Sequence, residues 1–121
     1  KRSANSISSN FAKLAERNGA QVVAVQGFND AVALLLAGRV DATVNDYLSY
    51  LDFKKQQPQA KVKVVARDDS AEFGVSGILM RKGQAQLKAA IDKAIGDLIA
   101  DGTYKKISER YFGEDLSTKL H

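Results

Sequence analysis

Hydrophobic and polar positions along the chain follow two alternating patterns. Within residues 1–70, short runs rich in valine and alanine separate longer stretches in which apolar residues recur every three or four positions. The short runs predict buried strands, and the longer stretches predict helices with one apolar face. A regular alternation of strand and helix is typical of parallel strands joined by right-handed helical crossovers. The pattern therefore predicts an α/β fold.

Local signals set the expected bounds of these elements. Ser9 is expected to cap a first helix, which Asn18-Gly19 ends. Asn29 is expected to cap the second helix, Gly38 to end it, and the third helix must stop before Pro58. The expected strands span residues 1–4, 21–25, 42–44 and 62–66, and the expected helices span residues 9–17, 29–37 and 47–56.

The second part of the chain has a different pattern. A polar break at residues 67–72 precedes an expected strand over 73–80, and a long helix is predicted over 84–100. Gly102 is expected to end that helix, and a last helix over 104–111 is expected to turn Ile107 and Tyr111 inward. The long helix carries one predicted apolar stripe, formed by Leu87, Ala90, Ile91, Ala94, Ile95 and Leu98.

Composition narrows the classes of function. The chain has 121 residues and a net charge of +4, but its basic and acidic residues are interleaved, so we expect no nucleic-acid partner. It has no cysteine, and its one histidine is the terminal His121. We therefore expect no metal, no cofactor and no catalysis, because a nucleophile paired with a base is also not visible. No apolar run is long enough to span a bilayer, and an exported precursor would carry its secretion signal outside these residues.

A first polar cluster precedes the first helix. Residues 3–10 carry six hydroxyl or amide side chains between a strand and a helix start. Unpaired N–H groups at a helix N-terminus attract anions, and the hydroxyls of Ser6 and Ser8 would add donors for a carboxylate. The alternative is that Ser9 caps the helix and its neighbours only fill a polar loop.

A second candidate is Asp46, which follows the expected strand 42–44 and begins a helix. Ligands of open parallel sheets bind outside the carboxyl ends of the strands, and a carboxylate there suits an ammonium group. The alternative is an N-cap for the helix starting at Tyr47, a residue that is either core or the wall of a pocket. Asp41 is expected to be a turn residue that pairs with Arg39 or binds backbone amides.

Several motifs resemble those of one family, in the same order. The motifs are Ser6-Ile7-Ser8-Ser9-Asn10, Gly38-Arg39-Val40-Asp41-Ala42-Thr43-Val44-Asn45-Asp46, Gly77-Ile78-Leu79-Met80-Arg81-Lys82-Gly83, and Ala100-Asp101-Gly102-Thr103-Tyr104-Lys105-Lys106-Ile107 with Tyr111-Phe112-Gly113. Together they resemble the second half of the family 3 solute-binding proteins of bacterial ABC importers, in their polar amino-acid branch and most closely its cystine type.

This resemblance implies a fold, a function and a location. The fold would be a three-layer α/β sandwich with a mainly parallel sheet, one truncated lobe of the type II periplasmic-binding-protein class. Ser6, Ile7 and Ser8 would bind the ligand's carboxylate, although a serine at position 8 replaces the family's usual threonine, and Asp46 would bind the amino group. The partners would be a free polar amino acid and an ABC permease. The location would be periplasmic or extracellular, and whether a lipid anchor holds the parent protein stays open.

The resemblance also implies a missing half. Residues 1–70 would form the second lobe, and residues 71–121 would be the return strand and C-terminal helices of the other lobe. The apolar stripe of the long helix would then be exposed, so that this segment docks back on its own sheet or swaps with a second copy into a homodimer. Two alternative functions stay open on the same fold, a periplasmic sensory or receptor domain and a dehydratase-like enzyme.

Overall fold

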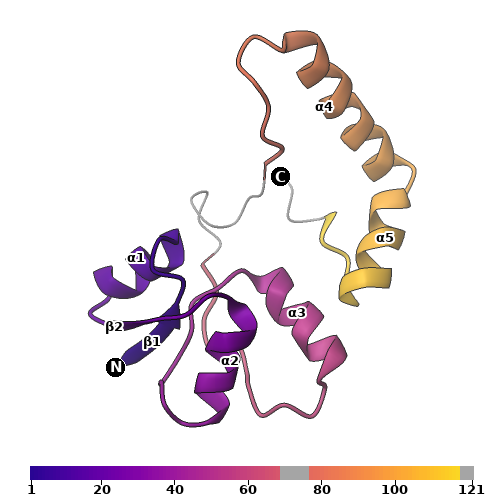
Figure 1. Cartoon of the computed structure of the whole chain (residues 1–121). Coiled ribbons are helices and arrows are strands. Elements are labelled where there is room, and N and C mark those ends of the chain that lie inside the picture. The colour runs from indigo at the N-terminus through magenta and orange to yellow at the C-terminus, as the bar shows by residue number, and fades with distance from the viewer. Residues whose placement is uncertain (69–76, 118–121) are drawn as a thin grey trace. The chain divides into compact units, whose positions relative to one another are not determined.

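The structure is a computed structural model that describes residues 1–68 and 77–117. Its elements are β1 (Arg2–Asn5), α1 (Asn10–Arg17), β2 (Gln21–Ala24), α2 (Phe28–Leu36), α3 (Tyr47–Gln56), α4 (Ala85–Ala100) and α5 (Thr103–Phe112), as labelled in Figure 1. The chain divides into two compact units, Lys1–Val65 and Ala66–His121. Each unit is described by itself.

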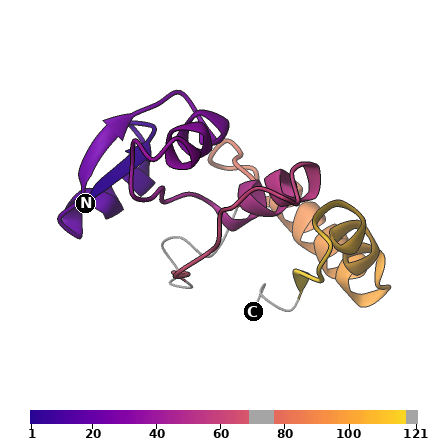
Figure 2. The ribbon, with the colours of Figure 1, turned by 90° about the horizontal axis from the view of Figure 1, so that it is seen from below.

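The first unit is built on a parallel sheet in which β1 is central. β1 pairs with β2 in parallel from Arg2 opposite Gln21 to Asn5 opposite Ala24, and the two strands lie side by side in Figures 1 and 2. On its other side, Ser3 forms a parallel bridge with Ala42. The predicted strand over 42–44 is therefore reduced to one bridge, and only the parallel arrangement of the three segments is confirmed.

The helix α1 begins and ends as its sequence predicts. The Ser9 hydroxyl accepts a hydrogen bond from the backbone N–H of Ala12 at 3.1 Å, which caps the first turn. Ala12 and Ala15 are buried on the face that contacts the strands. Gly19 follows with a φ of 75°, a left-handed conformation that glycine adopts without steric cost.

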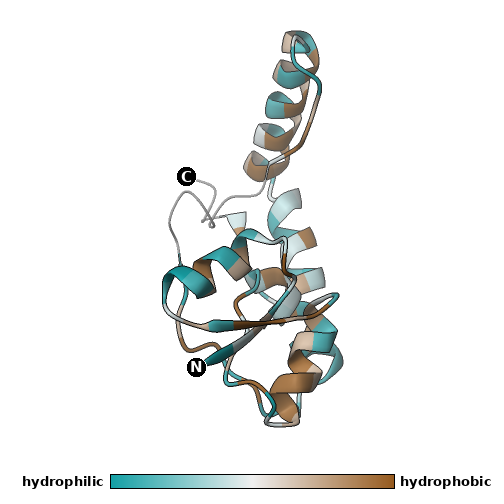
Figure 3. Ribbon diagram, turned by 60° about the vertical axis from the view of Figure 1, so that its left-hand side comes forward, coloured by the Kyte–Doolittle hydropathy of each residue, from teal (hydrophilic) through white to brown (hydrophobic). Residues whose placement is uncertain are grey.

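The apolar helix α2 supplies the centre of the core. Ala31 of α2 packs with Ala4 of β1 and with Val40, and all three side chains are buried. Figure 3 shows the corresponding run of hydrophobic residues along this helix. The helix starts at Phe28 after Gly27, without a side-chain cap, so the predicted capping role of Asn29 is wrong.

The helix α3 matches its predicted bounds and is fixed at both ends. Asp46 caps its N-terminus, and the Lys54 ammonium donates hydrogen bonds to the carbonyls of Pro58 and Ala60 just beyond its C-terminus, at 2.7 and 3.1 Å. Phe53 is buried and meets Phe28 edge to face, with ring centroids 5.8 Å apart. This aromatic contact holds α2 against α3.

Two predicted strands are not observed in the described residues. The run 62–66 has no strand, and Val64 and Val65 are 40% and 81% exposed. A β-rich run needs a partner strand before it can bury its side chains, and none pairs with it within residues 1–68 and 77–117. Of the predicted strand 73–80, residues 77–80 are not a strand, and the rest lies outside the described residues.

In its described residues, the second unit contains two consecutive helices. α4 ends at Ala100 with Asp101 as its C-cap, and Gly102 has a φ of 78°, which turns the chain directly into α5. No residue of α4 is buried, and Leu87 and Leu98 of its predicted apolar stripe are 48% and 38% exposed. In the described part of the chain no helix has the length and apolar character needed to cross a membrane.

The inward orientation predicted for two α5 residues is wrong. Ile107 and Tyr111 are 50% and 55% exposed. The buried residue of α5 is instead Ser108, whose hydroxyl donates to the Glu114 carbonyl at 2.6 Å and accepts from the Leu116 N–H at 3.0 Å. A polar side chain therefore anchors the segment that follows this helix.

Candidate functional site

One edge of the sheet collects the residues that follow the strands. Because β1, β2 and the segment around Ala42 run in parallel, their carboxyl ends meet at the same edge. Ser6 follows β1, Gln26 follows β2 by two residues, and Asp46 follows the third segment. This is the edge at which open parallel sheets bind ligands.

The loop between β1 and α1 is a tight turn held by Ser9. The backbone N–H and the hydroxyl of Ser9 both donate to the Ser6 carbonyl, at 3.0 and 2.6 Å. The Ser6 hydroxyl donates to the Gln26 carbonyl at 3.1 Å, which ties this loop to the end of β2. Ser8 and Ile7 are exposed, the latter by 73%. Ser9 therefore caps α1, whereas Ile7 and Ser8 are exposed to solvent.

An open hollow of about 640 Å³ lies beside this loop. Ser6, Ile7 and Ser8 line it together, so the structure gathers the three predicted carboxylate-binding residues at one place. Its remaining lining residues come from the end of β2 and from α2: Ala24, Val25, Gln26, Asp30, Ala33 and Leu34. The hollow therefore offers donors from the loop and a carboxylate from α2.

Asp46 is the N-cap of α3, as the alternative reading of this residue stated. Its carboxylate accepts hydrogen bonds from the N–H and the hydroxyl of Ser49, at 3.1 and 2.5 Å. Asp46 is nevertheless exposed, and a carboxylate with two oxygens has further lone pairs to offer. Capping and binding an ammonium group are therefore compatible roles.

The Tyr47 side chain stacks on Tyr50 one helical turn later. The two ring centroids are 5.9 Å apart, and both residues are half-buried. Tyr47 and Asp46 line neither the hollow beside the serine loop nor the second hollow of this unit. Asp46 shares the sheet edge with Ser6, but the structure does not bring the two into one hollow.

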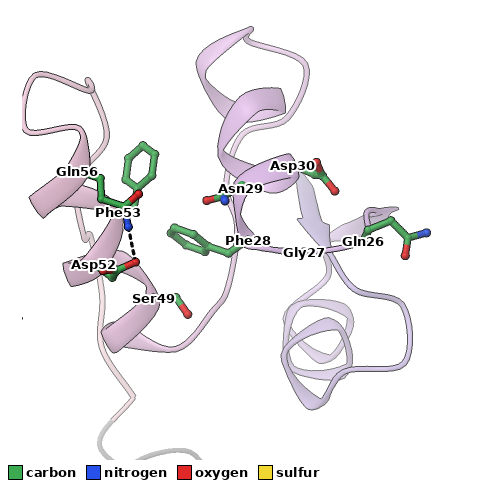
Figure 4. A pocket seen from close by; sticks show the side chains of 9 residues that line it. All are labelled: Gln26, Gly27, Phe28, Asn29, Asp30, Ser49, Asp52, Phe53 and Gln56. Atoms are coloured by element: carbon green, nitrogen blue, oxygen red, sulfur yellow. Dashed lines mark hydrogen bonds between the residues drawn. The ribbon is translucent and has the colours of Figure 1, made fainter. Parts of the chain in front are cut away.

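A second open hollow, of about 540 Å³, lies between α2 and α3 (Figure 4). Phe28 and Phe53 contribute aromatic surface, and Asp52 accepts a hydrogen bond from the Gln56 amide at 2.7 Å. Its lining residues are Gln26, Gly27, Phe28, Asn29, Asp30, Ser49, Asp52, Phe53 and Gln56.

Sequence reasoning missed two residues of this region. Gln26 and Asp30 line both hollows. The available signal was position: Gln26 comes directly after the predicted strand 21–25, at the same sheet edge as Ser6 and Asp46. Gln26 carries an amide, and not a hydroxyl or a charged group, at a place equivalent to those of Ser6 and Asp46.

Asp41 lies outside this edge, at the opposite end of the sheet. It accepts a hydrogen bond from the backbone N–H of Arg2 at 2.6 Å, so the prediction that it binds backbone amides is confirmed. That hydrogen bond lowers the pKa of the Asp41 carboxyl, and the positive charges of Lys1 and Arg2 lower it further. Its role is to join the start of β1 to the segment at Ala42.

The chain is similar to proteins that bind amino acids. It is 38% identical over 117 residues to the L-cystine-binding protein TcyA of Bacillus subtilis (strain 168). The aligned residues cover 97% of this chain and 43% of TcyA. It is 34% identical over 102 residues to the histidine-binding periplasmic protein of Salmonella typhimurium (strain LT2). Here the aligned residues cover 81% of this chain and 39% of the relative. The chain thus spans less than half the length of either.

Solved structures are similar over nearly the whole chain. The L-cystine solute receptor of Neisseria gonorrhoeae, in its unliganded open conformation, superposes with a TM-score of 0.75 at 40% identity, covering 95% of this chain and 48% of the receptor. An ancestral arginine-binding protein bound to arginine superposes with a TM-score of 0.66 at 34% identity, covering 93% of this chain and 50% of that protein.

The parallel strands with helical crossovers and these solved relatives define an α/β fold of the type II periplasmic-binding-protein class. A model of one family, the bacterial extracellular solute-binding proteins, family 3, matches residues 10–114. The chain belongs to this family.

Proposed function

We propose that this chain is part of the substrate-binding component of an ABC importer for polar amino acids, and that it binds its ligand without chemistry. The carrying observation is the sheet edge, where the donor-rich loop after β1 and the carboxylate of Asp46 follow two adjacent parallel segments. An α-amino acid needs both a carboxylate site and an ammonium site. Cystine is the first ligand to test, because TcyA and the Neisseria receptor are both named for it.

Each end of the ligand has proposed partners. The backbone N–H groups of Ser6, Ile7 and Ser8 and the hydroxyl of Ser8 bind the α-carboxylate, supported by the common place of these residues around one hollow. The exposed carboxylate of Asp46 binds the α-ammonium group, while its cap of α3 keeps it in place. Tyr47, stacked on Tyr50, stands beside Asp46 as a wall for the ligand's side chain.

The two units correspond to parts of two lobes in this proposal. Residues 1–70 are the ligand-binding second lobe, and residues 71–121 belong with the first lobe. The division of the chain after Val65 and the exposed apolar residues of α4 support this assignment. Because the chain spans less than half the length of TcyA, the remaining ligand contacts would come from the part it lacks, and affinity of the chain alone should be low.

The setting of the parent protein follows from the same proposal. It would act in the periplasm or outside the cell, with a lipid anchor as one way of holding it there, and would deliver its ligand to an ABC permease. In the chain alone, the segment that carries α4 would swap with that of a second copy, which forms a homodimer. Light scattering tests this pairing, and a monomer at all concentrations would contradict it.

Calorimetric titration with cystine, cysteine, glutamine, arginine and histidine tests the binding proposal. The unchanged chain is compared with Asp46→Asn and Asp46→Ala, because asparagine caps helices as well as aspartate but cannot pair with an ammonium group. We expect at least one ligand to bind the unchanged chain and neither variant. Equal binding by Asp46→Asn would contradict the role of Asp46, and heat from none of the five ligands would show that the chain does not bind them alone.

A further inference from the structure

Among residues 1–68 and 77–117, Asn5 has the largest fully buried side chain, with 1% of its surface exposed. It is the last residue of β1 and directly precedes Ser6. A buried amide is costly unless its donors and acceptor are used, so its hydrogen bonds indicate why it is there.

Both ends of the Asn5 amide are engaged. The Ser3 hydroxyl donates to its Oδ1 at 2.6 Å, and its Nδ2 donates to the carbonyl of Val44 at 2.5 Å. A backbone carbonyl can only accept, so Nδ2 must face Val44, and Ser3 then fixes the amide in that orientation.

The bond from Asn5 Nδ2 to the Val44 carbonyl replaces one backbone hydrogen bond of the sheet. Backbone pairing between β1 and the third segment includes the Ala42 N–H bonded to the Arg2 carbonyl at 3.2 Å and the Ala4 N–H bonded to the Ala42 carbonyl at 3.0 Å. In a continuing parallel ladder, the Ser6 N–H would donate to the Val44 carbonyl. The Asn5 side chain takes that carbonyl instead, and within the described residues the Ser6 N–H donates to no protein acceptor.

We propose that Asn5 is a positioning residue for amino-acid binding: it holds Val44, and with it Asp46, at a fixed distance from the loop of Ser6, and it spares the Ser6 N–H for the ligand's carboxylate. The proposal rests on the proposed function of this edge. Ser6 is next to Asn5, and Asp46 is two residues beyond Val44, so little chain separates the Asn5–Val44 bond from either half of the site.

A fixed spacing predicts discrimination by ligand length. L-Arginine has one carbon between its carboxylate and ammonium groups, whereas L-β-homoarginine has two. We expect Asn5→Ala to lower the ratio of their affinities, arginine over β-homoarginine, by about fivefold or more. A variant that is only less folded would lose affinity for both ligands by the same factor, so the ratio separates positioning from stability.

Thr43→Val is the matched control. The Thr43 hydroxyl donates to the Ala4 carbonyl at 2.7 Å, so this variant also removes a side-chain bond between the third segment and β1, but leaves the Val44 carbonyl bonded to Asn5. We expect it to lower the melting temperature and keep the affinity ratio. An unchanged ratio in Asn5→Ala, or an equal fall in Thr43→Val, would overturn the proposal.

A readout without ligand separates this inference from the proposed function. In ¹H–¹⁵N spectra of the free chain, Asn5→Ala should shift the amide resonances of Ser6 and Ser49 more than Thr43→Val does. If the unchanged chain binds neither arginine nor β-homoarginine, the proposed function fails for the chain alone, and the spectra still decide the positioning. Unmoved Ser6 and Ser49 resonances in Asn5→Ala would overturn it.

Discussion

The Asp41 carboxylate and the Arg2 backbone N–H are joined by a 2.6 Å hydrogen bond across 39 positions of sequence. The bond closes the amino-terminal end of the central strand against the third segment of the sheet. It is the charged counterpart, at one end of that strand, of the neutral bond between Asn5 and Val44 at the other.

This bond predicts an acid-sensitive contribution to stability. Because the Arg2 N–H lowers the pKa of Asp41 below its ordinary value of 3.8, the contribution is complete above that pH and is lost as the pH falls through the lowered pKa. Asp41→Asn should therefore lower the melting temperature at pH 7, and the difference from the unchanged chain should shrink toward pH 2. Circular dichroism melts at both pH values check this.

The exposed Glu16 of α1 provides the control for Asp41. Glu16→Gln removes an acidic group of the same charge and should leave the melting temperature at pH 7 almost unchanged. A gap between Asp41→Asn and the unchanged chain that stays constant with pH would mean that the charge of Asp41 is not what stabilises this end of the sheet.

The capping bond of Asp46 predicts a difference between two substitutions. Asp46→Ala removes the acceptor for the Ser49 N–H and should destabilise the first unit by about 1 kcal/mol, whereas Asp46→Asn should cost much less. Urea unfolding followed by circular dichroism measures both. Equal losses would indicate that the negative charge at the start of α3, rather than its hydrogen bond, stabilises the helix.

The buried hydroxyl of Ser108 predicts a local loss of order when it is removed. Ser108→Ala leaves the Leu116 N–H and the Glu114 carbonyl without this partner, at a cost of roughly 1–3 kcal/mol. Hydrogen exchange at the Leu116 amide should accelerate strongly while exchange in the middle of α4 stays the same. If Leu116 exchanges at its original rate, the hydroxyl does not hold this segment.

Two glycines of the second unit predict opposite effects of the same substitution. Gly102 has a φ of 78°, so Gly102→Ala forces a left-handed alanine and should destabilise the α4–α5 connection by about 1–2 kcal/mol. Gly96 lies inside α4 with nothing within 4 Å of an added Cβ, so Gly96→Ala should stabilise the helix by roughly 1 kcal/mol. Helix content and melting temperature check both signs.

The parts of the fold that depend on local chemistry could be predicted from the sequence. The bounds of α3 follow from an aspartate before it and Pro58 after it, and Ser9 caps α1 as its hydroxyl predicts. The start of α2 was misplaced because Gly27 offers no side chain to recognise, and helix starts without a cap leave no local signal.

The parts that depend on distant contacts could not be predicted in the same way. The valine-rich run 62–66 has strand composition, but a strand exists only where a partner accepts its hydrogen bonds. The inward orientation assigned to Ile107 and Tyr111 assumed a surface for α5 to pack on, and both residues are exposed. Residue type and position predict Ser6, Ser8 and Asp46 as binding residues, and that role stays a prediction, whereas the bond from Asn5 to Val44 joins residues distant in sequence and has no local signal.

The central place of β1 has a consequence for how this protein can be shortened. The family match begins at residue 10, so a piece trimmed to that boundary would look complete by sequence comparison. Such a piece would lack the strand against which both other segments of the sheet are aligned, because β1 ends at Asn5. β2 and the segment around Ala42 would then have no strand between them to pair with. Deleting the nine residues before the family match would therefore remove the sheet and not only a terminus.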